Sequence, residues 1–304
     1  LSNFLLAEAV EEAGLPPGVV NVVPGGREVG ERLVVHPSID KIAFTGSTAA
    51  GKKIMALCAD QVKRVSLELG GKSAAVVLDD VSIAEVLPRL VGAAMHLSGQ
   101  VCGAQTRVLV PRSRYAEALD AAAAAASATV VGDPHDPTTQ VGPLVAERQR
   151  DRVQGYIALA LEQGARVVAG GGRPAHLPKG WYVEPTVLGD VDNTMRVARE
   201  EIFGPVVCVI PFDDDDEAVR IANDSAFGLA GGVWSADPAR ALRVARRLRT
   251  GSVAVNGNFP PFPHVPFGGF KESGLGRELG PEGLANFLEP RSIGIPEELV
   301  DGRT

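Results

Sequence analysis

The stretch KIAFTGSTAAGKK, residues 41–53, contains an apolar run, a glycine and a helix-forming segment in direct succession. Its first part, Lys41–Thr45, is typical of a buried strand, and Ser47–Leu57 is typical of a helix. Gly46 lets the backbone turn sharply between them. Because a strand joined to a helix by a short turn is the repeating unit of parallel sheets, the stretch predicts an α/β fold.

The alternation of strands and helices continues on both sides of this stretch. Upstream, a helix up to Gly14 is followed by the strand-like run Val19–Val23 and a short helix from Arg27 to about Val35. Downstream, the predicted strands are 65–69, 74–78, 107–110, 206–210, 231–234 and 252–256, and the predicted helices are 86–97, 116–126, 145–163, 216–223 and 238–248. We expect a domain change near Gly70 and a loop-rich segment at 170–185.

Composition narrows the class of protein. The chain has 304 residues, 45% of them hydrophobic, and a formal net charge of −7. This length suits two domains, and the acidic balance argues against a nucleic-acid or anionic-membrane partner. No apolar run approaches the roughly 20 residues that cross a bilayer, and three cysteines cannot form a disulfide framework. The sequence therefore predicts a cytoplasmic α/β protein, and its excess of arginine over lysine is associated with bacteria.

One of the three cysteines is a candidate nucleophile. Cys58 and Cys208 lie in apolar helix and strand patterns, which is typical of small buried side chains. Cys102 instead lies among small residues where a helix gives way to a loop, so a ligand can approach its sulfur.

Two side chains could act as a base for Cys102. Glu68 lies near the C-terminal end of the predicted strand 65–69, whose other residues are apolar or small. Open α/β sheets place their ligands at such strand ends, and partial burial there would raise the pKa of Glu68. A salt-bridged glutamate at a strand end is an equally good interpretation. His96 precedes Cys102 by six residues, which would suit a cysteine hydrolase, although a helix-surface histidine is the simpler interpretation.

The segment that begins with Gly46 and Ser47 is a candidate phosphate site. It nearly matches a P-loop, but Lys53 stands where a magnesium-binding serine or threonine is needed, which argues against an NTPase. The free N–H groups at the helix start suit a dinucleotide pyrophosphate as well. The acidic run Asp213–Asp216 opens a predicted helix, where carboxylates are favoured electrostatically, and we predict no metal site.

Five short motifs together resemble the NAD(P)-dependent aldehyde dehydrogenases over nearly the whole chain. They are, in the family's usual order, FTGST (44–48), LELGGKS (67–73), GQVCGA (99–104), EEIFGPV (200–206) and PFGGFKESGLGRE (266–278). Glu68 and Cys102 lie 34 residues apart, as is typical of the family's glutamate and cysteine motifs. Any one match would be weak, but five in register are specific.

The resemblance implies a fold and an organisation. The fold would be aldehyde-dehydrogenase-like, a partial Rossmann-type parallel sheet followed by an α/β catalytic domain. Residues 1–69 would be the second half of a nucleotide-binding domain, residues 70–272 the catalytic domain, and residues 273–304 a return segment ending in an oligomerisation strand at 291–295. The family's first two nucleotide-binding strands would precede residue 1. With them present, a homodimer or homotetramer is expected.

The resemblance also implies a reaction. The thiolate of Cys102 would attack a small aldehyde to give a thiohemiacetal, and loss of hydride to the cofactor would leave a thioester. Glu68 would then activate the water that releases the carboxylate, and the backbone N–H of Cys102 would help to hold the oxyanion. NAD is the expected cofactor, with NADP not excluded. The alternative is a catalytically silent fragment or subunit with a structural or binding role.

Further site residues follow from the same likeness. Those expected to bind the cofactor are Gly25, Gly46, Ser47, Leu69, Gln149, Glu201 and Phe203, and those expected to line the substrate pocket are Val101, Gly103 and Phe267. Ser47 would lie at the pyrophosphate, Glu201 at the nicotinamide ribose and Phe203 near the nicotinamide. Phe259, Phe262 and Phe267 suggest a partly aromatic pocket for an apolar aldehyde, although phenylalanines in such a proline-rich loop are at least as often packing residues.

Overall fold

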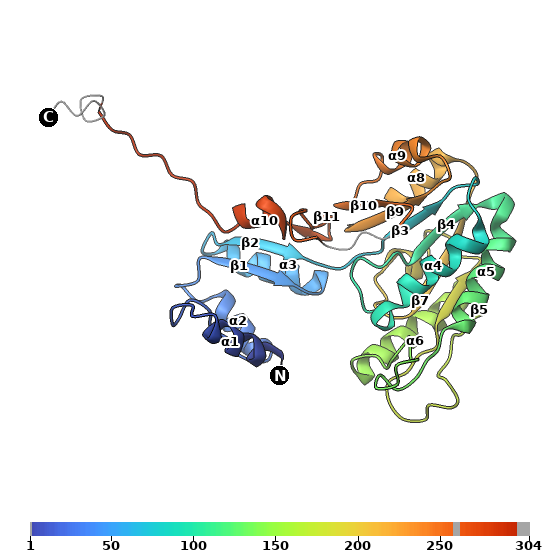
Figure 1. The fold of residues 1–304 in the computed structure, drawn as a ribbon, viewed down its shortest axis with the longest axis horizontal. Coiled ribbons are helices and arrows are strands. Elements are labelled where there is room, and N and C mark those ends of the chain that lie inside the picture. Colours follow the sequence, from blue (N-terminus) through green and yellow to red (C-terminus); the bar gives the residue numbers. More distant parts are fainter. Residues whose placement is uncertain (1, 258–261, 297–304) are drawn as a thin grey trace. The chain divides into compact units, whose positions relative to one another are not determined.

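The computed structural model describes residues 2–257 and 262–296, shown in Figure 1. The chain forms two compact units. The first comprises residues 1–42 and 52–65, and the second comprises residues 43–51 together with residues from 66 onward.

The second unit is built on a seven-stranded sheet with the strand order β10-β9-β3-β4-β7-β6-β5. Its strands are β3 (Ala74–Val77), β4 (Arg107–Pro111), β5 (Arg166–Ala169), β6 (Thr186–Gly189), β7 (Val206–Phe212), β9 (Ala230–Trp234) and β10 (Ser252–Val255). All neighbouring strands pair in parallel except β5, which runs antiparallel to β6. Apart from Arg107 at the start of β4, the residues of β3, β4 and β7 are apolar, as expected where helices cover both faces of a sheet.

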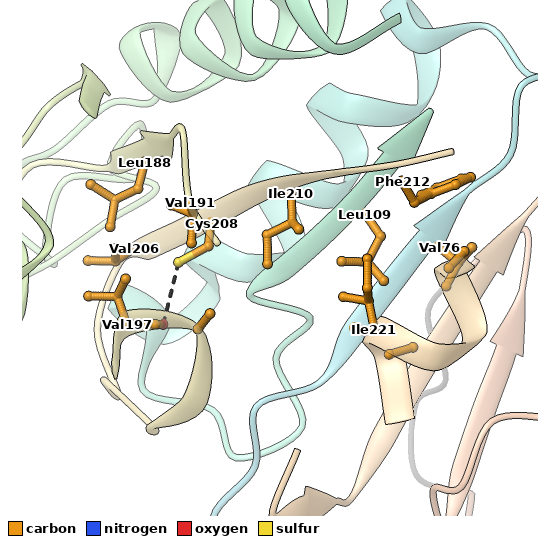
Figure 2. Close-up of a cluster of buried hydrophobic side chains, with 14 of the residues drawn as sticks. Val76, Leu109, Leu188, Val191, Val197, Val206, Cys208, Ile210, Phe212 and Ile221 are labelled. Carbon is orange, nitrogen blue, oxygen red and sulfur yellow. Dashed lines mark hydrogen bonds between the residues drawn. The ribbon is translucent and has the colours of Figure 1, made fainter. Parts of the chain in front are cut away.

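Two apolar cores lie on opposite faces of this sheet. The first face packs Ala75, Val77 and Val108 against α4 (Ile83–Met95) and α5 (Tyr115–Ala128). On the second face, Val76, Leu109 and Ile210 pack against other helices. These helices are α6 (Glu147–Glu162), α7 (Arg196–Arg199), α8 (Asp215–Asn223) and α9 (Pro238–Ala245). Figure 2 shows part of this second core, in which the Cys208 thiol donates to the Val197 carbonyl at 3.4 Å.

Shorter elements complete the chain. β1 (Lys41–Thr45), β2 (Arg64–Glu68) and β12 (Gly274–Leu275) form a three-stranded sheet in that order, and β8 (Phe227–Gly228) pairs with β11 (Phe270–Lys271). The remaining helices are α1 (Ser2–Glu12), α2 (Arg27–Val34), α3 (Thr48–Ala59) and α10 (Gly280–Ala285), with short 3₁₀ turns at His96–Gly99 and Arg112–Arg114. In the first unit, Val34 and Cys58 are the buried hydrophobic side chains among the described residues.

Two predictions about elements need correction, and several short elements were not predicted. Val19–Val23 forms no strand, because none of the described residues pairs with it, and Val19, Val20 and Val23 are exposed. Lys41–Thr45 is a strand, but its residues are half-buried or exposed and not buried. The strands β5, β6, β8, β11 and β12 and the helices α7 and α10 were not anticipated, because two to six residues are too few to show a period.

The predicted domain limits at residues 69/70 and 272/273 stay a prediction. Arg291–Ile295, the expected oligomerisation strand, has no strand pairing among the described residues, and Ile293 and Ile295 are exposed.

Candidate active site

Glu68 is the last residue of β2, and the backbone around it is fixed by β12, Ser273 and Gly46. Residues 274–275 of β12 pair antiparallel with β2, and Gly274 lies opposite Glu68. The Leu69 N–H donates to the Ser273 carbonyl at 2.9 Å, and the Ser273 hydroxyl donates to the Gly70 carbonyl at 2.7 Å. The Gly46 N–H donates to the Glu68 carbonyl at 3.0 Å. The motifs FTGST and KESGLG therefore fix the end of the strand that carries the glutamate.

The carboxyl group of Glu68 is buried and has no hydrogen-bond partner among the described residues. The backbone of Gly268 lies directly against it, since a Cβ built on Gly268 would come within 2.6 Å of the Glu68 Oε1 atom. Burial, followed by the neighbouring charge of Glu278, raises the pKa of Glu68 to about 8. A carboxyl group with this pKa can hold or accept a proton near neutral pH, as a general base requires.

Cys102 follows a turn in a rare backbone conformation. Leu97, Ser98 and Gly99 have consecutive positive φ angles of 50°, 58° and 73°. Two side-chain bonds hold this turn, one from the Ser98 hydroxyl to the Gly142 carbonyl at 2.9 Å and one from the Gln100 amide to the Leu97 carbonyl at 3.1 Å. Strained backbone of this kind concentrates at functional sites.

The glutamate and cysteine motifs meet at Gly71. A Cβ on Gly71 would overlap the carbonyl oxygen of Cys102, so only glycine allows the two backbones to lie this close. The Gly71 N–H also donates to the Glu201 Oε1 atom at 3.1 Å, and a Cβ on Gly70 would come within 2.5 Å of Glu201 Oε2. These glycines bring Cys102 and Glu201 together.

The electrostatics around the thiol disfavour negative charge. Burial, with the carboxylate of Glu201 next, raises the pKa of Cys102 above its ordinary value, while the Gly103 N–H that points toward the sulfur acts in the opposite direction. Burial also raises the pKa of Glu201, again opposed by the Gly71 N–H. Three acidic groups with raised pKa values thus share one site, and a cation placed among them would be stabilised.

Cys102 lies between two cavities and lines both, together with Val101. The first cavity has a volume of about 520 Å³ and is lined by Thr45, Gly46, Ser47, Glu68, Leu69, Gly70, Leu97, Gln100, Val101, Cys102, Gln149, Arg152, Glu201 and Phe203. The second cavity has a volume of about 740 Å³ and is lined by Leu90, Gly92, Ala93, His96, Val101, Cys102, Gly103, Ala104, Gln105, Ala230, Gly231, Ser252 and Phe267. We call them the glutamate cavity and the apolar cavity.

The glutamate cavity contains the features that suit a dinucleotide. The start of α3 faces it through Gly46 and Ser47, and the Ser47 hydroxyl accepts the Ala50 N–H at 3.3 Å, which leaves other first-turn N–H groups for an anion. The Gln149 amide donates to the carbonyl groups of Ile202 and Phe203 at 3.1 and 2.7 Å, which ties the α6 helix to the EEIFGPV segment.

Most of the predicted site residues are brought together. Six of the predicted cofactor residues line the glutamate cavity, namely Gly46, Ser47, Leu69, Gln149, Glu201 and Phe203, and all three predicted substrate residues line the apolar cavity, namely Val101, Gly103 and Phe267. Gly25 belongs to the first unit and lines neither cavity. Phe262 lines neither cavity and lies instead beside the ring of His264, and Phe259 is outside the described residues.

The roles of some residues at the site could not be predicted from the sequence. Arg152 is the one arginine or lysine among the described residues that line the glutamate cavity. Its guanidinium donates to the Glu201 and Ile202 carbonyls. One arginine among many on a polar helix cannot be singled out. Gly268 and Ser273 belong to the motif at 266–278, but only the fold reveals that the Gly268 backbone lies against Glu68 and that Ser273 bonds to Leu69 and Gly70. His96 lines the apolar cavity, so it stays a candidate neighbour of Cys102.

A cysteine that lines two cavities of an α/β protein, with a buried carboxyl group lining one of them, is an arrangement that suits a thiol-dependent enzyme. The chain belongs to the aldehyde dehydrogenase family, whose sequence pattern matches residues 1–293. It is 51% identical to the geranial dehydrogenase of Castellaniella defragrans over 96% of this chain and 61% of that protein. It is 44% identical to the chloroplastic betaine aldehyde dehydrogenase of Beta vulgaris over 94% of this chain and 57% of that protein.

Solved structures agree with this assignment. An aldehyde dehydrogenase of Mycobacterium tuberculosis complexed with NAD⁺ has a TM-score of 0.95 at 48% identity, covering 97% of this chain and 61% of that one. A mutant of aldehyde dehydrogenase C from Pseudomonas syringae, complexed with NAD⁺ and octanal, has a TM-score of 0.92 at 47% identity, covering 95% of this chain and 60% of that one. The chain thus spans about three-fifths of the relatives it matches.

Two features are absent from the described residues. No helix in this part of the chain is long and apolar enough to span a membrane. No group of three or more His, Cys, Asp or Glu side chains in residues 2–257 and 262–296 could hold a metal ion.

Proposed function

We propose that this chain carries the catalytic site for the NAD-dependent oxidation of an aldehyde to a carboxylate, with a covalent bond to Cys102. The observation that carries the proposal is the position of Cys102 between two cavities, with the unpartnered carboxyl group of Glu68 in one of them. The two cavities give the thiol access to a cofactor and to a substrate from different sides.

The residues of the glutamate cavity fit NAD. Its three acidic groups with raised pKa values suit the positive charge of an oxidised nicotinamide. The start of α3 at Ser47 suits the pyrophosphate, and the carboxylate of Glu201 suits the hydroxyl groups of a ribose. Leu69, Gln149 and Phe203 would line the remaining contact surface. When bound there, NAD supplies the hydride acceptor.

The first covalent step uses Cys102. Its sulfur adds to the aldehyde carbon, the thiol proton is lost to a neighbouring base, and the oxygen anion that forms is held by the backbone N–H of Cys102. Since the thiol has a raised pKa, it is protonated at neutral pH until a base or a nearby cation favours the thiolate. After the carbon is oxidised, a thioester remains on Cys102.

The second covalent step uses Glu68. Its carboxylate accepts a proton from water, the water oxygen attacks the thioester carbon, and the carbon–sulfur bond breaks to release the carboxylate product. Because the carboxyl group must be ionised to act, the rate of thioester hydrolysis is expected to rise with pH and to reach half its maximum near the pKa of about 8.

The test is a rapid-mixing assay of this chain with NAD and octanal that follows the reduced cofactor. We expect a burst of about one equivalent per chain. The Cys102→Ala variant should give none, and Glu68→Gln should give the burst followed by steady-state turnover at least about 100-fold slower, without the pH dependence. Cys58→Ala, which alters a thiol that lines neither cavity, should match the parent chain.

The outcomes separate the candidate functions. Equal turnover in Cys102→Ala would refute the mechanism. Acyl transfer from Cys102 that needs no NAD and is lost in His96→Ala would favour a cysteine hydrolase, which the position of His96 on the apolar cavity allows. Absence of a burst under all conditions would favour a catalytically silent fragment or subunit.

Assembly and compartment are part of the proposal through family likeness alone. We infer a homodimer or homotetramer for a chain with the family's full nucleotide-binding domain, and a cytoplasmic location. Light scattering at several protein concentrations tests the first.

A further inference from the structure

The apolar cavity has a wall without charged side chains. Among the described residues that line it, none is Asp, Glu, Lys or Arg, and most are aliphatic residues, glycine or alanine. The buried polar atoms Gln105 Oε1 and Ser252 Oγ belong to this wall but expose almost no surface to the cavity. Phe267 is the one aromatic residue other than His96 in this described lining. Such a wall solvates an uncharged hydrocarbon and offers no charged partner to a cation.

Gly92 is an unexplained glycine in this wall. It lies inside α4, in the last turn before the helix ends at Met95, and glycine within a helix is less favourable than alanine. Its φ angle is not positive, and a Cβ built on it would have no atom within 4 Å. Neither backbone conformation nor close packing therefore requires glycine here. What glycine does provide is space on the helix face that lines the apolar cavity, one turn before His96.

We propose that the apolar cavity binds an uncharged, medium-chain apolar aldehyde, and that Gly92 sets the length of chain it accepts. The inference rests on the proposed function, because it assumes that Cys102 attacks an aldehyde. A side chain at residue 92 would fill the space that the distal carbons of a long aldehyde need. Binding of a short aldehyde, which reaches only the region around Cys102, would be unchanged.

The proposal can be tested without turnover. A thiol adds reversibly to an aldehyde, forming a sulfur–carbon bond while the thiol proton moves to the carbonyl oxygen. The product is a thiohemiacetal, which requires neither oxidant nor cofactor. An aldehyde that binds in the cavity therefore protects Cys102 from alkylation by iodoacetamide. Mass spectrometry of the Cys102 peptide measures this protection separately from Cys58 and Cys208, which are buried.

Three aldehydes are compared on the full chain, namely octanal, propanal and the cationic betaine aldehyde. We expect octanal to protect Cys102 half-maximally at a concentration at least tenfold below that of propanal, and betaine aldehyde to be no better than propanal. In Gly92→Leu and Gly92→Phe, the concentration of octanal needed should rise at least tenfold, while that of propanal should change less than twofold.

Gly155→Leu is the matched control. Gly155 also lies inside a helix, α6, has no atom within 4 Å of a built Cβ, and lines neither cavity. It should leave all three protection curves unchanged, and circular dichroism verifies that each variant is folded.

Each result has a distinct meaning. Equal effects of the Gly92 variants on octanal and propanal, or no effect on either, would overturn the role of Gly92. Better protection by betaine aldehyde than by octanal would overturn the apolar substrate class. If iodoacetamide alkylates Cys102 and none of the aldehydes protects it in the parent chain, then the proposed function itself fails.

Discussion

At the scale of single residues, the charges around Cys102 decide when it is reactive. Its thiol is flanked by Glu201 and Glu68, and burial and these carboxylates raise its pKa. An ordinary catalytic cysteine has a lowered pKa because it lies beside a cation. Here the described residues that line the glutamate cavity include a single arginine, Arg152, whose guanidinium is directed to backbone carbonyls. The raised pKa favours the protonated thiol at neutral pH, and a positive charge placed beside it would favour the thiolate.

This arrangement predicts the pH dependence of alkylation. The rate of reaction of Cys102 with iodoacetamide should rise with pH and reach half its maximum above the ordinary thiol pKa of 9.0. Glu201→Gln removes a negative charge, so it should lower the thiol pKa and raise the alkylation rate at pH 7.5 by at least about twofold. Glu200→Gln is the control, because that carboxylate is paired with Arg196 and Tyr156 and does not line the cavity. A slower reaction in Glu201→Gln would contradict the argument.

At the scale of elements, the turn between α4 and Cys102 was only partly predictable. The change from helix to loop at this point follows from the small residues around Cys102, and the structure agrees. That Leu97 and Ser98 adopt positive φ angles does not follow, because these residue types rarely do so. The conformation is imposed by tertiary contacts of Ser98 and Gln100 with Gly142 and Val145.

Gly99 tests this turn. Its φ angle is 73°, and a Cβ there would overlap the carbonyl group of Gly204. Gly99→Ala should therefore destabilise the chain by roughly 2–4 kcal/mol through backbone strain and overlap, and it should slow alkylation of Cys102 by displacing the loop. Gly142→Ala, where the new Cβ would meet only Pro134 at 3.8 Å, should change stability by less than about 1 kcal/mol. Denaturant unfolding measures both, and equal effects would refute the account.

At the scale of the whole molecule, the two units differ in how much apolar surface they bury. The second unit contains both apolar cores, whereas the described residues of the first unit bury only Val34 and Cys58 among their hydrophobic side chains. Leu5, Leu6 and Met55 of the first unit are exposed. Burial of apolar side chains is the main source of stability, so the two units should not be equally stable.

Hydrogen exchange tests this difference. Amides of α2 in the first unit should exchange at least about 100-fold faster, relative to their intrinsic rates, than those of β4 and β7 in the second. Mass spectrometry of peptic peptides from the intact chain gives both values in one experiment. Similar protection in α2 and in the central strands would show that the two units unfold as one.

The amino-acid sequence is enough to predict the fold class, and it marks Cys102 and Glu68 as candidates for the nucleophile and the base. Apolar runs and helical periodicity are properties of short segments, so they can be recognised in the sequence. Glu68 stands out as a carboxylate in a strand of apolar and small residues, and Cys102 as a cysteine among small residues where a helix gives way to a loop. The folded chain was needed to show that Gly71 joins their motifs, that Cys102 lies between two cavities, and that Gly92 lines one of them. These features depend on which backbones come close across long sequence separations, and a glycine in the sequence does not reveal what it makes room for.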